Sequence, residues 1–256
     1  MPSKASLLTL ARDLKRRKAR ERQSLFVAEG VRAVEELLRS PLQIRGALGT
    51  DAVRRLPRGE ALIAAFAARQ LPFDEVSEKD FLSAADTEHP QGILAVAEVP
   101  SQTIASIQLG PAARILVLDA IQDPGNVGTL VRTAAAMGAA AVVALPGTAD
   151  LWNAKVVRSA AGAHFRLPLV HSSVDELLAF LIDNHVPLWG TAADGAHISE
   201  VVAPPRLAIA VGNEGAGLSD RIRAAAVHVV SLPMAGGVES LNVAVAAGIT
   251  LYALRQ

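Results

Sequence analysis

The sequence contains no cysteine, and only 4% of its residues are aromatic, with a single Tyr. Without cysteine the chain can form neither disulfide bonds nor thiolate metal sites. The absence of cysteine also agrees with a reducing compartment, so we expect a cytoplasmic protein. Scarce aromatic side chains argue against a surface that binds nucleic acid by stacking bases on aromatic rings.

Long apolar runs are missing as well. Residues 1–8 (MPSKASLL) lack the apolar core of a signal peptide. Each apolar segment is interrupted by Gly, Pro or a charge before it reaches the ~18 residues of a membrane helix. The 256 residues are nevertheless 51% hydrophobic, which is enough for a substantial core in one or two domains. We therefore expect a soluble protein without membrane contact.

Several catalytic signatures are also absent. The chain has no G-x-x-x-x-G-K-[ST] phosphate loop, no G-x-G-x-x-G dinucleotide loop and no G-x-S-x-G nucleophile turn. Its six His residues are scattered without the spacing of metal ligands, so we expect no metal site. P-loop enzymes, triad hydrolases and zinc enzymes are thereby disfavoured, as is an oxidoreductase with the usual dinucleotide loop.

The net charge of zero hides an uneven distribution. Residues 1–60 hold 14 Lys and Arg against 7 Asp and Glu, a balance of +7, and residues 61–256 hold 11 against 18, a balance of −7. A run of six cations follows a helical pattern near the N-terminus: Lys15, Arg16, Arg17, Lys18, Arg20 and Arg22. Such a run is either the solvated end of a helix or a contact with nucleic-acid phosphates.

Residues 1–99 predict a small α/β domain. Strands are expected at 24–28, 44–48, 73–76 and 93–99, and helices at 31–38 and 61–68. Ser77 and Asp80 have the spacing of a capping box and predict a further helix. Residues 100–110 are polar and poor in large apolar side chains, so we expect a linker there.

Residues 111–256 predict a second α/β domain. Apolar strands are expected at 115–118, 140–145, 165–170, 186–192, 206–211 and 227–232, with helices at 129–137, 153–161, 174–183, 221–226 and 241–254. This alternation predicts a parallel sheet covered on both faces through right-handed βαβ units. In the last helix six residues form one apolar stripe: Leu241, Ala244, Val245, Gly248, Ile249 and Tyr252.

Three polar loops, 119–128, 212–220 and 232–242, each follow an expected strand. In open α/β sheets, ligands bind beyond the carboxyl ends of the strands. Each loop also has a plain interpretation: Asn126 could cap a helix that carries Arg132 on its solvated face, the second loop could be a flexible turn, and Ser240 could cap the last helix. The functional interpretation gives Arg132 a phosphate to bind and places Glu214 beside a ligand.

In order and spacing, the three loops resemble the three motifs of the SpoU/TrmH branch of the SPOUT RNA methyltransferases. The corresponding segments are IQDPGNVGTLVRTAAAMGA, VGNEGAGLS and LPMAGGVESLNVAVAAGI, and the resemblance spans most of residues 114–254. LFVAEGVRAVEELL and HPQGILAV carry a weaker likeness to the substrate-binding domain that precedes many of these enzymes. That domain resembles ribosomal protein L30e and is expected to bind RNA.

The resemblance implies a parallel-sheet domain closed by a deep trefoil knot, a homodimer, and S-adenosylmethionine bound in the knot. It places five residues at the cofactor: Ala192, Gly212, Leu232, Met234 and Leu241. The glycine pair Gly236-Gly237 would let the chain pass close to the ligand. The implied reaction is methyl transfer to a ribose 2′-hydroxyl, with ribosomal RNA slightly preferred over transfer RNA. A non-catalytic RNA-binding protein with the same fold is the alternative.

By motif position, Arg132 matches the proposed catalytic arginine of the family. A guanidinium holds its proton and is a poor base, so we expect Arg132 to orient the hydroxyl or to stabilise developing negative charge. Asn126 would position Arg132 or the ribose, while Glu214, Ser240 and Asn242 complete the polar lining. Because methyl transfer is a displacement at carbon, the positioning of the two reactants is the main contribution expected of the enzyme.

Overall fold

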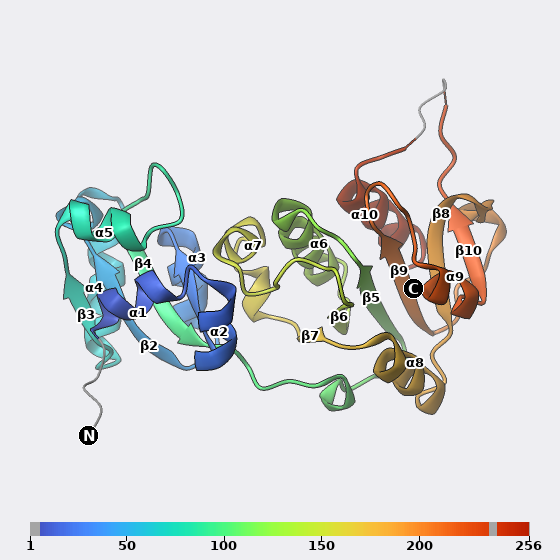
Figure 1. The fold of residues 1–256 in the computed structure, drawn as a ribbon, viewed down its shortest axis with the longest axis horizontal. Helices are drawn as coiled ribbons and strands as arrows, with labels where there is room; N and C mark the ends of the chain where they lie inside the picture. Colours follow the sequence, from blue (N-terminus) through green and yellow to red (C-terminus); the bar gives the residue numbers. More distant parts are fainter. Residues whose placement is uncertain (1–5, 236–239, 256) are drawn as a thin grey trace. The chain divides into compact units, whose positions relative to one another are not determined.

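The computed structural model describes residues 6–235 and 240–255 and divides into two compact units (Figure 1). Unit 1 comprises residues 1–100 and 152–165, and unit 2 comprises residues 101–151 and 166–256. Residues 100–110, expected to be a linker, contribute Ile104 and Ile107 to the core of unit 2. The functional limits of 1–99 and 111–256 stay a prediction. Within the described ranges, no helix is long and apolar enough to cross a membrane.

Unit 1 is built on a four-stranded sheet with the strand order β1-β4-β2-β3. The strands are β1 (Leu25–Glu29), β2 (Ile44–Gly49), β3 (Phe73–Glu75) and β4 (Ile93–Glu98), and β4 runs antiparallel to β1 and β2. The helices of the unit are α1 (Leu7–Asp13), α2 (Arg17–Gln23), α3 (Val31–Arg39), α4 (Gly59–Ala68), α5 (Glu78–Ala84) and α7 (Ala154–Ser159). The small α/β arrangement expected from the sequence is thus present.

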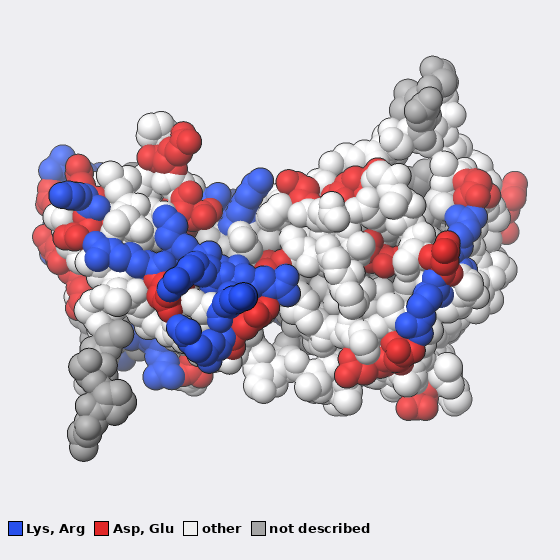
Figure 2. Space-filling view, in the orientation of Figure 1, with Lys and Arg blue, Asp and Glu red and all other residues white. Residues whose placement is uncertain are grey.

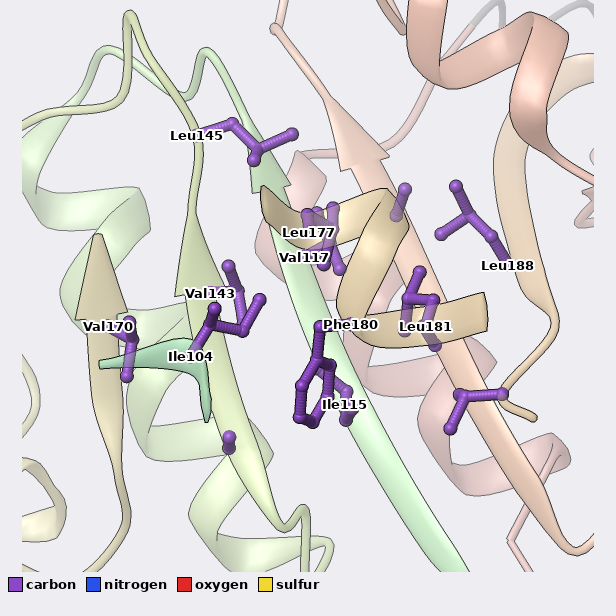
Figure 3. Close-up of a cluster of buried hydrophobic side chains, with 14 of the residues drawn as sticks. Ile104, Ile115, Val117, Val143, Leu145, Val170, Leu177, Phe180, Leu181 and Leu188 are labelled. Atoms are coloured by element: carbon purple, nitrogen blue, oxygen red, sulfur yellow. The ribbon is translucent and has the colours of Figure 1, made fainter. Parts of the chain in front are cut away.

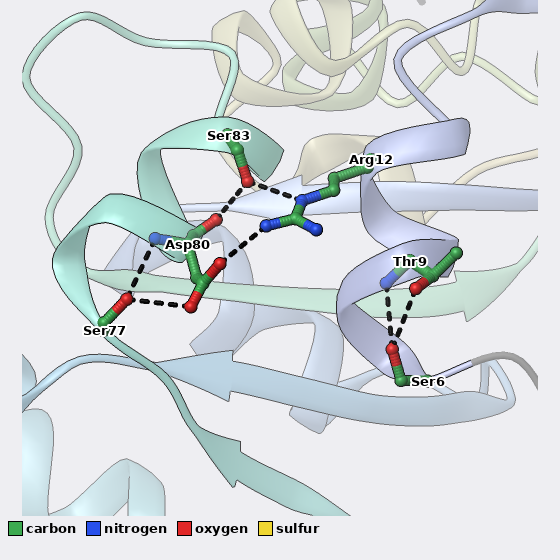
Figure 4. A network of polar contacts seen from close by, with 6 residues as sticks. All are labelled: Ser6, Thr9, Arg12, Ser77, Asp80 and Ser83. Atoms are coloured by element: carbon green, nitrogen blue, oxygen red, sulfur yellow. Dashed lines mark hydrogen bonds and ion pairs between the residues drawn. The ribbon is translucent and has the colours of Figure 1, made fainter.

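A polar network holds α1 to α5 above a shared apolar core (Figure 4). The Oγ of Ser77 accepts a hydrogen bond from the backbone N–H of Asp80 at 3.1 Å, which confirms the expected cap. Arg12 donates from Nη2 to Asp80 at 2.7 Å and from Nε to Ser83 at 2.6 Å. These contacts fix the first helix of the chain on the unit that carries most of the basic residues.

Unit 2 contains a six-stranded, all-parallel sheet with the order β10-β8-β9-β5-β6-β7. Its strands are β5 (Ala113–Asp119), β6 (Ala141–Ala144), β7 (Leu169–His171), β8 (Leu188–His197), β9 (Arg206–Gly212) and β10 (His228–Ser231). Its helices are α6 (Pro124–Ala136), α8 (Val174–Asp183), α9 (Asp220–Ala225) and α10 (Val243–Ala253). Ile115, Val117 and Val143 from the sheet pack against Leu177 and Phe180 of α8 (Figure 3). The predicted parallel α/β architecture is confirmed.

Several element boundaries differ from the prediction, among them those of α6 and β7. Helix α6 begins at Pro124 and not at residue 129, because the carboxylate of Asp123 accepts from the N–H of Asn126 at 2.8 Å and caps the helix. Pro124 then occupies a first-turn position, where its missing N–H costs nothing. The strand expected at 165–170 is reduced to β7, since Phe165 ends a short 3₁₀ turn.

The pairing of β8 with β10 is interrupted. Val229 pairs with Gly190 and the next residue, Val230, pairs with Ala196, so residues 191–195 of β8 lie outside the ladder. A Cβ added to Gly195 would lie 2.6 Å from the carbonyl oxygen of Val229, which is closer than side chains approach backbone. The return of β8 to the ladder after residues 191–195 therefore requires glycine at position 195, where the two strands meet again.

Arg114 on β5 ties down the end of α10 from inside the unit. Its side chain donates from Nε and Nη2 to the carbonyl oxygen of Leu254, at 2.9 and 2.7 Å, and from Nη1 to that of Pro205 at 2.7 Å. The residue is 8% exposed, and burial lowers the pKa of its guanidinium. Its hydrogen bonds satisfy the two carbonyl groups as well as the cation.

We expect Arg114→Met to lower the free energy of unfolding by about 1–3 kcal/mol, because the carbonyl of Leu254 loses both donors, whereas that of Pro205 keeps the N–H of Ala113. Urea denaturation followed by circular dichroism measures this change. The control is Arg221→Met, which removes an exposed ion pair with Asp175 and should change the stability much less. Equal stability of the two variants would contradict the structural role of Arg114.

Candidate functional site

A cavity of about 400 Å³ lies in unit 2, beside the carboxyl ends of β8, β9 and β10. The five residues expected at the cofactor all line it: Ala192, Gly212, Leu232, Met234 and Leu241. Glu214, Ser240 and Asn242 also line it, whereas Asn126 and Arg132 are not on its wall. The loops 212–220 and 232–242 thus meet as expected, although contact with a cofactor stays a prediction. The pair Gly236-Gly237 lies outside the described residues.

The loop after β9 is a closed turn and not the flexible turn considered above. Asn213 and Gly217 exchange two backbone hydrogen bonds of 2.9 Å. The side-chain oxygen of Asn213 accepts from the N–H groups of Gly215 and Ala216, and its Nδ2 donates to the carbonyl of Ala120. Asn213 was not among the predicted site residues. Its signal was an Asn at a turn, where a side-chain oxygen readily accepts from the backbone two residues on.

A chain of side-chain hydrogen bonds joins all three loops. Asn126 donates from Nδ2 to Oε1 of Glu214 at 2.9 Å, and its Oδ1 accepts from Nδ2 of Asn242 at 2.9 Å. Asn126 therefore connects the loop after β9 with the start of α10. The plain interpretation of Asn126 as a helix cap is wrong, because Asp123 caps α6. The amide of Asn126 instead connects Glu214 with Asn242.

The last helix is capped by Asn242 and not by Ser240. The Oδ1 of Asn242 accepts from the N–H of Ala244 at 2.9 Å and from that of Val245 at 3.4 Å. The helix begins at Val243, so Ser240 lies two residues before the cap position. Ser240 therefore keeps its hydroxyl for the cavity that it lines.

Two opposing effects act on the carboxyl group of Glu214. Burial raises its pKa, but hydrogen bonds from Asn126 and from the backbone N–H groups of Glu214, Gln122 and Asp123 together lower it below the ordinary value of 4.5. A carboxyl whose pKa is lowered on folding stabilises the folded loop above its ordinary pKa. That contribution is lost as the pH falls through the folded-state value. Glu214 is thus an ionised acceptor at neutral pH.

Asn126→Ala is expected to raise the pKa of Glu214, because the side-chain hydrogen bond from Asn126 leads the contributions that lower it. Titration of the Glu214 side-chain carbon by NMR measures the shift. Thr129→Ala on the same helix serves as the control, since its hydroxyl donates only to the carbonyl of Gly125. If Asn126→Ala left the pKa of Glu214 unchanged, the hydrogen bond from Asn126 would not be what stabilises the ionised carboxylate.

Arg132 lies exposed on α6. Within residues 6–235 and 240–255, its guanidinium has neither a hydrogen-bond acceptor nor an ion-pair partner. The side chain is therefore available to a ligand rather than engaged in the fold. Since it is absent from the cavity wall, its proposed role requires the RNA or a second copy of the chain to bring it to the reacting groups.

The basic run lies on α2 and on the turn that precedes it, where Lys and Arg gather on the surface of unit 1 (Figure 2). Most of these cations already have partners. Arg16 and Arg22 share Asp13, and Arg17 pairs with Glu21. Arg20 is 6% exposed and donates to the backbone carbonyls of residues 14 and 15. The prediction that Arg20 contacts RNA is therefore wrong, because its guanidinium holds the turn together.

Both parts of the chain match known protein families, and the chain is similar to characterised methyltransferases. Residues 113–252 match the SpoU rRNA Methylase family, and residues 9–95 match the MRM3-like substrate binding domain. The 23S rRNA (guanosine(2553)-2′-O)-methyltransferase RlmP of Bacillus subtilis (strain 168) is 38% identical over 240 residues, covering 93% of this chain and 92% of RlmP. The 23S rRNA (guanosine-2′-O-)-methyltransferase RlmB of Salmonella typhi is 31% identical over 239 residues, covering 89% of this chain and 97% of RlmB.

Solved structures agree with the sequence matches. The SpoU methyltransferase AviRb from Streptomyces viridochromogenes, in complex with S-adenosylmethionine (AdoMet), has a TM-score of 0.86 and 27% identity, covering 98% of this chain and 97% of AviRb. An AdoMet-bound rRNA methyltransferase from Sinorhizobium meliloti also has a TM-score of 0.86, with 26% identity and coverage of 98% and 94%. The expected knotted α/β fold, methyltransferase activity and cofactor are confirmed, and the chain belongs to the SpoU rRNA methylase family.

Proposed function

We propose that the protein transfers a methyl group from S-adenosylmethionine to a ribose 2′-hydroxyl of 23S rRNA in the cytoplasm. The observation that carries the proposal is the Asn242–Asn126–Glu214 relay, which joins the three motif loops beside one cavity. RlmP and RlmB, which are similar over most of their length, are named for this reaction on 23S rRNA. A binding protein without activity would have no need to keep this relay, so the non-catalytic alternative is disfavoured.

The residues around the cavity fit S-adenosylmethionine. Leu232, Met234 and Leu241 offer an apolar wall, while Glu214 and Ser240 offer polar groups at the same cavity. This combination suits a ligand with a flat purine and a charged amino-acid end. When bound, the cofactor supplies a methyl group already activated on a sulfonium.

The protein's own task is to place and prepare the 2′-hydroxyl. The 2′-hydroxyl oxygen would take the methyl group that the bound sulfonium supplies, with the thioether as the leaving group, and would give up its proton to water. Arg132, whose donors have no acceptor among the described residues, orients this oxygen and stabilises the charge that develops on it. Asn126 and Asn242 hold the loops that line the cavity in one arrangement.

Helix α10 supports the proposal of a homodimer. Of the predicted stripe, Ala244 lies on the buried side of the helix, together with Ala247, Thr250 and Leu251. Four larger apolar side chains are instead 39–54% exposed: Leu241, Val245, Ile249 and Tyr252. Such a contiguous apolar face on a globular unit indicates an interaction surface, and we propose that a second copy covers it.

Ile249→Lys is expected to convert the dimer to a monomer, because a charge would have to be buried at the apolar face. Sedimentation equilibrium at micromolar protein measures the mass. Ile182→Lys on α8 is the control, since this isoleucine is 72% exposed and lies on another helix. A wild-type monomer, or a dimer in both variants, would contradict the assignment of this face.

Methyl transfer from labelled S-adenosylmethionine tests the proposed reaction directly. Purified 23S rRNA, 16S rRNA and transfer RNA would be offered separately, and ribose methylation mapped by resistance to alkaline cleavage. We expect one labelled position in 23S rRNA, and the same position should be unmodified in cells without the gene. Labelling confined to transfer RNA would overturn the proposed substrate, and cofactor binding without transfer to any RNA would favour the non-catalytic protein.

A further inference from the structure

We propose that a cavity in unit 1 binds one unpaired nucleotide of the substrate RNA, with the phosphate on Arg32 and Arg158. The inference rests on the proposed function, because it concerns the same RNA. The cavity has a volume of about 280 Å³. Its lining comes from the end of β1 and the start of α3, from the loop before β4, and from α7 with the residue Ala161 beyond it.

The two N-terminal segments singled out in the sequence meet at this cavity. Gln91, from HPQGILAV, accepts through Oε1 from the N–H of Val31 at 2.9 Å, and the N–H of Gly30 donates to the carbonyl of Ile93. Gly30 has a φ of 96°, and a Cβ there would lie 3.0 Å from Oε1 of Gln91. Because Oε1 faces Val31, the Nε2 group of Gln91 stays a donor, and it has no acceptor in the described parts of the chain.

Glu29 forms the floor of the cavity and is 3% exposed. Its carboxylate accepts from the N–H of Asp86 at 2.7 Å and from the hydroxyl and N–H of Thr87. The loop before β4 is therefore held rigidly against β1. A floor with a carboxylate and an amide donor suits the edge of an unpaired base, which carries both donors and acceptors. A phosphate is excluded from this floor by charge and belongs at the rim.

The rim carries the cations that a phosphate needs. Arg32 is exposed on the first turn of α3 and has no ion-pair partner among the residues that the structure describes. Among the residues that the structure describes, Arg158 on α7 pairs with Asp86 alone, at 3.4 Å, and a third of its side chain is exposed. Guanidinium groups bind phosphate oxygens through paired donors. These two cations are less committed to the fold than Arg16, Arg17 and Arg22 of the basic run.

The first test measures the affinity of the full-length protein for its 23S rRNA target at several salt concentrations. Arg32→Ala and Arg158→Ala should each raise Kd about tenfold or more, and each should reduce the slope of log Kd against log salt by about 0.7. Arg39→Ala is the matched control, since Arg39 lies on the same helix and pairs with Glu36. Calorimetry should show unchanged S-adenosylmethionine affinity in all three variants, which also checks their folding.

The second test uses the absence of cysteine from the chain. Arg32→Cys, Arg158→Cys and Arg39→Cys each introduce one thiol that can carry a photo-crosslinker. Crosslinks to rRNA from positions 32 and 158 but not from 39 are the expected result. If wild type methylates 23S rRNA while all three positions behave alike in both tests, the inference is overturned. If wild type neither binds nor methylates 23S rRNA, the proposed function fails and the inference with it.

Discussion

Arg132→Ala is expected to lower kcat for methyl transfer by about 10²–10³-fold, the usual cost of removing one donor that stabilises a developing oxyanion. The expectation follows from an exposed guanidinium that the described fold does not use. Because Arg132 does not line the cavity, the affinity for S-adenosylmethionine should stay unchanged. Single-turnover methylation, with calorimetry for the cofactor, separates the two quantities.

The matched control for Arg132→Ala is Arg223→Ala. That arginine is also exposed on a helix of unit 2, but it is paired with Asp194 at 2.7 Å. Its loss should leave kcat within about a factor of two, since exposed ion pairs contribute little and neither Arg223 nor Asp194 lines the cavity. If Arg132→Ala methylated RNA at the wild-type rate, Arg132 would not be the residue that orients the reacting oxygen and stabilises its charge.

Gly212→Ala is expected to weaken S-adenosylmethionine binding at least tenfold, or about 1.4 kcal/mol. A Cβ at Gly212 would lie 2.2 Å from the backbone carbon of Gly217 and 2.4 Å from the nitrogen of Leu218. The peptide group between Gly217 and Leu218 cannot yield as a flexible side chain would, so the closed turn has to open. Since Gly212 itself lines the cavity, the cofactor site would change shape with it.

Gly215→Ala tests whether the effect comes from this overlap. A Cβ at Gly215, in the same turn, meets only the side-chain oxygen of Asn213, at an ordinary 3.7 Å. We expect wild-type affinity and an unfolding temperature within a few degrees of wild type. Calorimetric titration of both variants decides the point, and comparable losses in the two would mean that the turn tolerates no side chain for some other reason.

Many strands and helices were predictable because they are determined by interactions between residues close together in the sequence. The run at 115–118 and, after Arg206, the run at 207–211 are apolar throughout, as strands buried on both faces require, and both lie in strands of the structure. The cap at Ser77 was predictable for the same reason, because the cap and the residue that donates to it lie three residues apart. Helix α8 has the predicted limits because Ser173 caps it and its apolar spacing is regular.

The parts that could not be predicted depend on contacts between distant residues. Asn126 and Asn242 are 116 positions apart, and no local pattern shows that their amides meet. Arg20 looked like its neighbours in a basic run, yet only the path of the chain around it shows that it is buried. The outward face of α10 was missed because both sides of that helix are apolar, and packing on α6 by small residues decides which side is covered.

The hydrogen bonds from Arg114 to Leu254 hold the end of α10 on β5, and the cofactor site depends on that docking. Asn242, Val243, Ala246 and Thr250 form part of the cavity wall, so no cofactor site exists until residues up to Leu254 have been synthesised and docked on β5. A ligand that binds only the docked state stabilises it in proportion to the logarithm of its concentration. Cellular S-adenosylmethionine would then act as a folding ligand for newly made chains, and starvation for methionine would shorten the lifetime of the protein before it limited its catalysis.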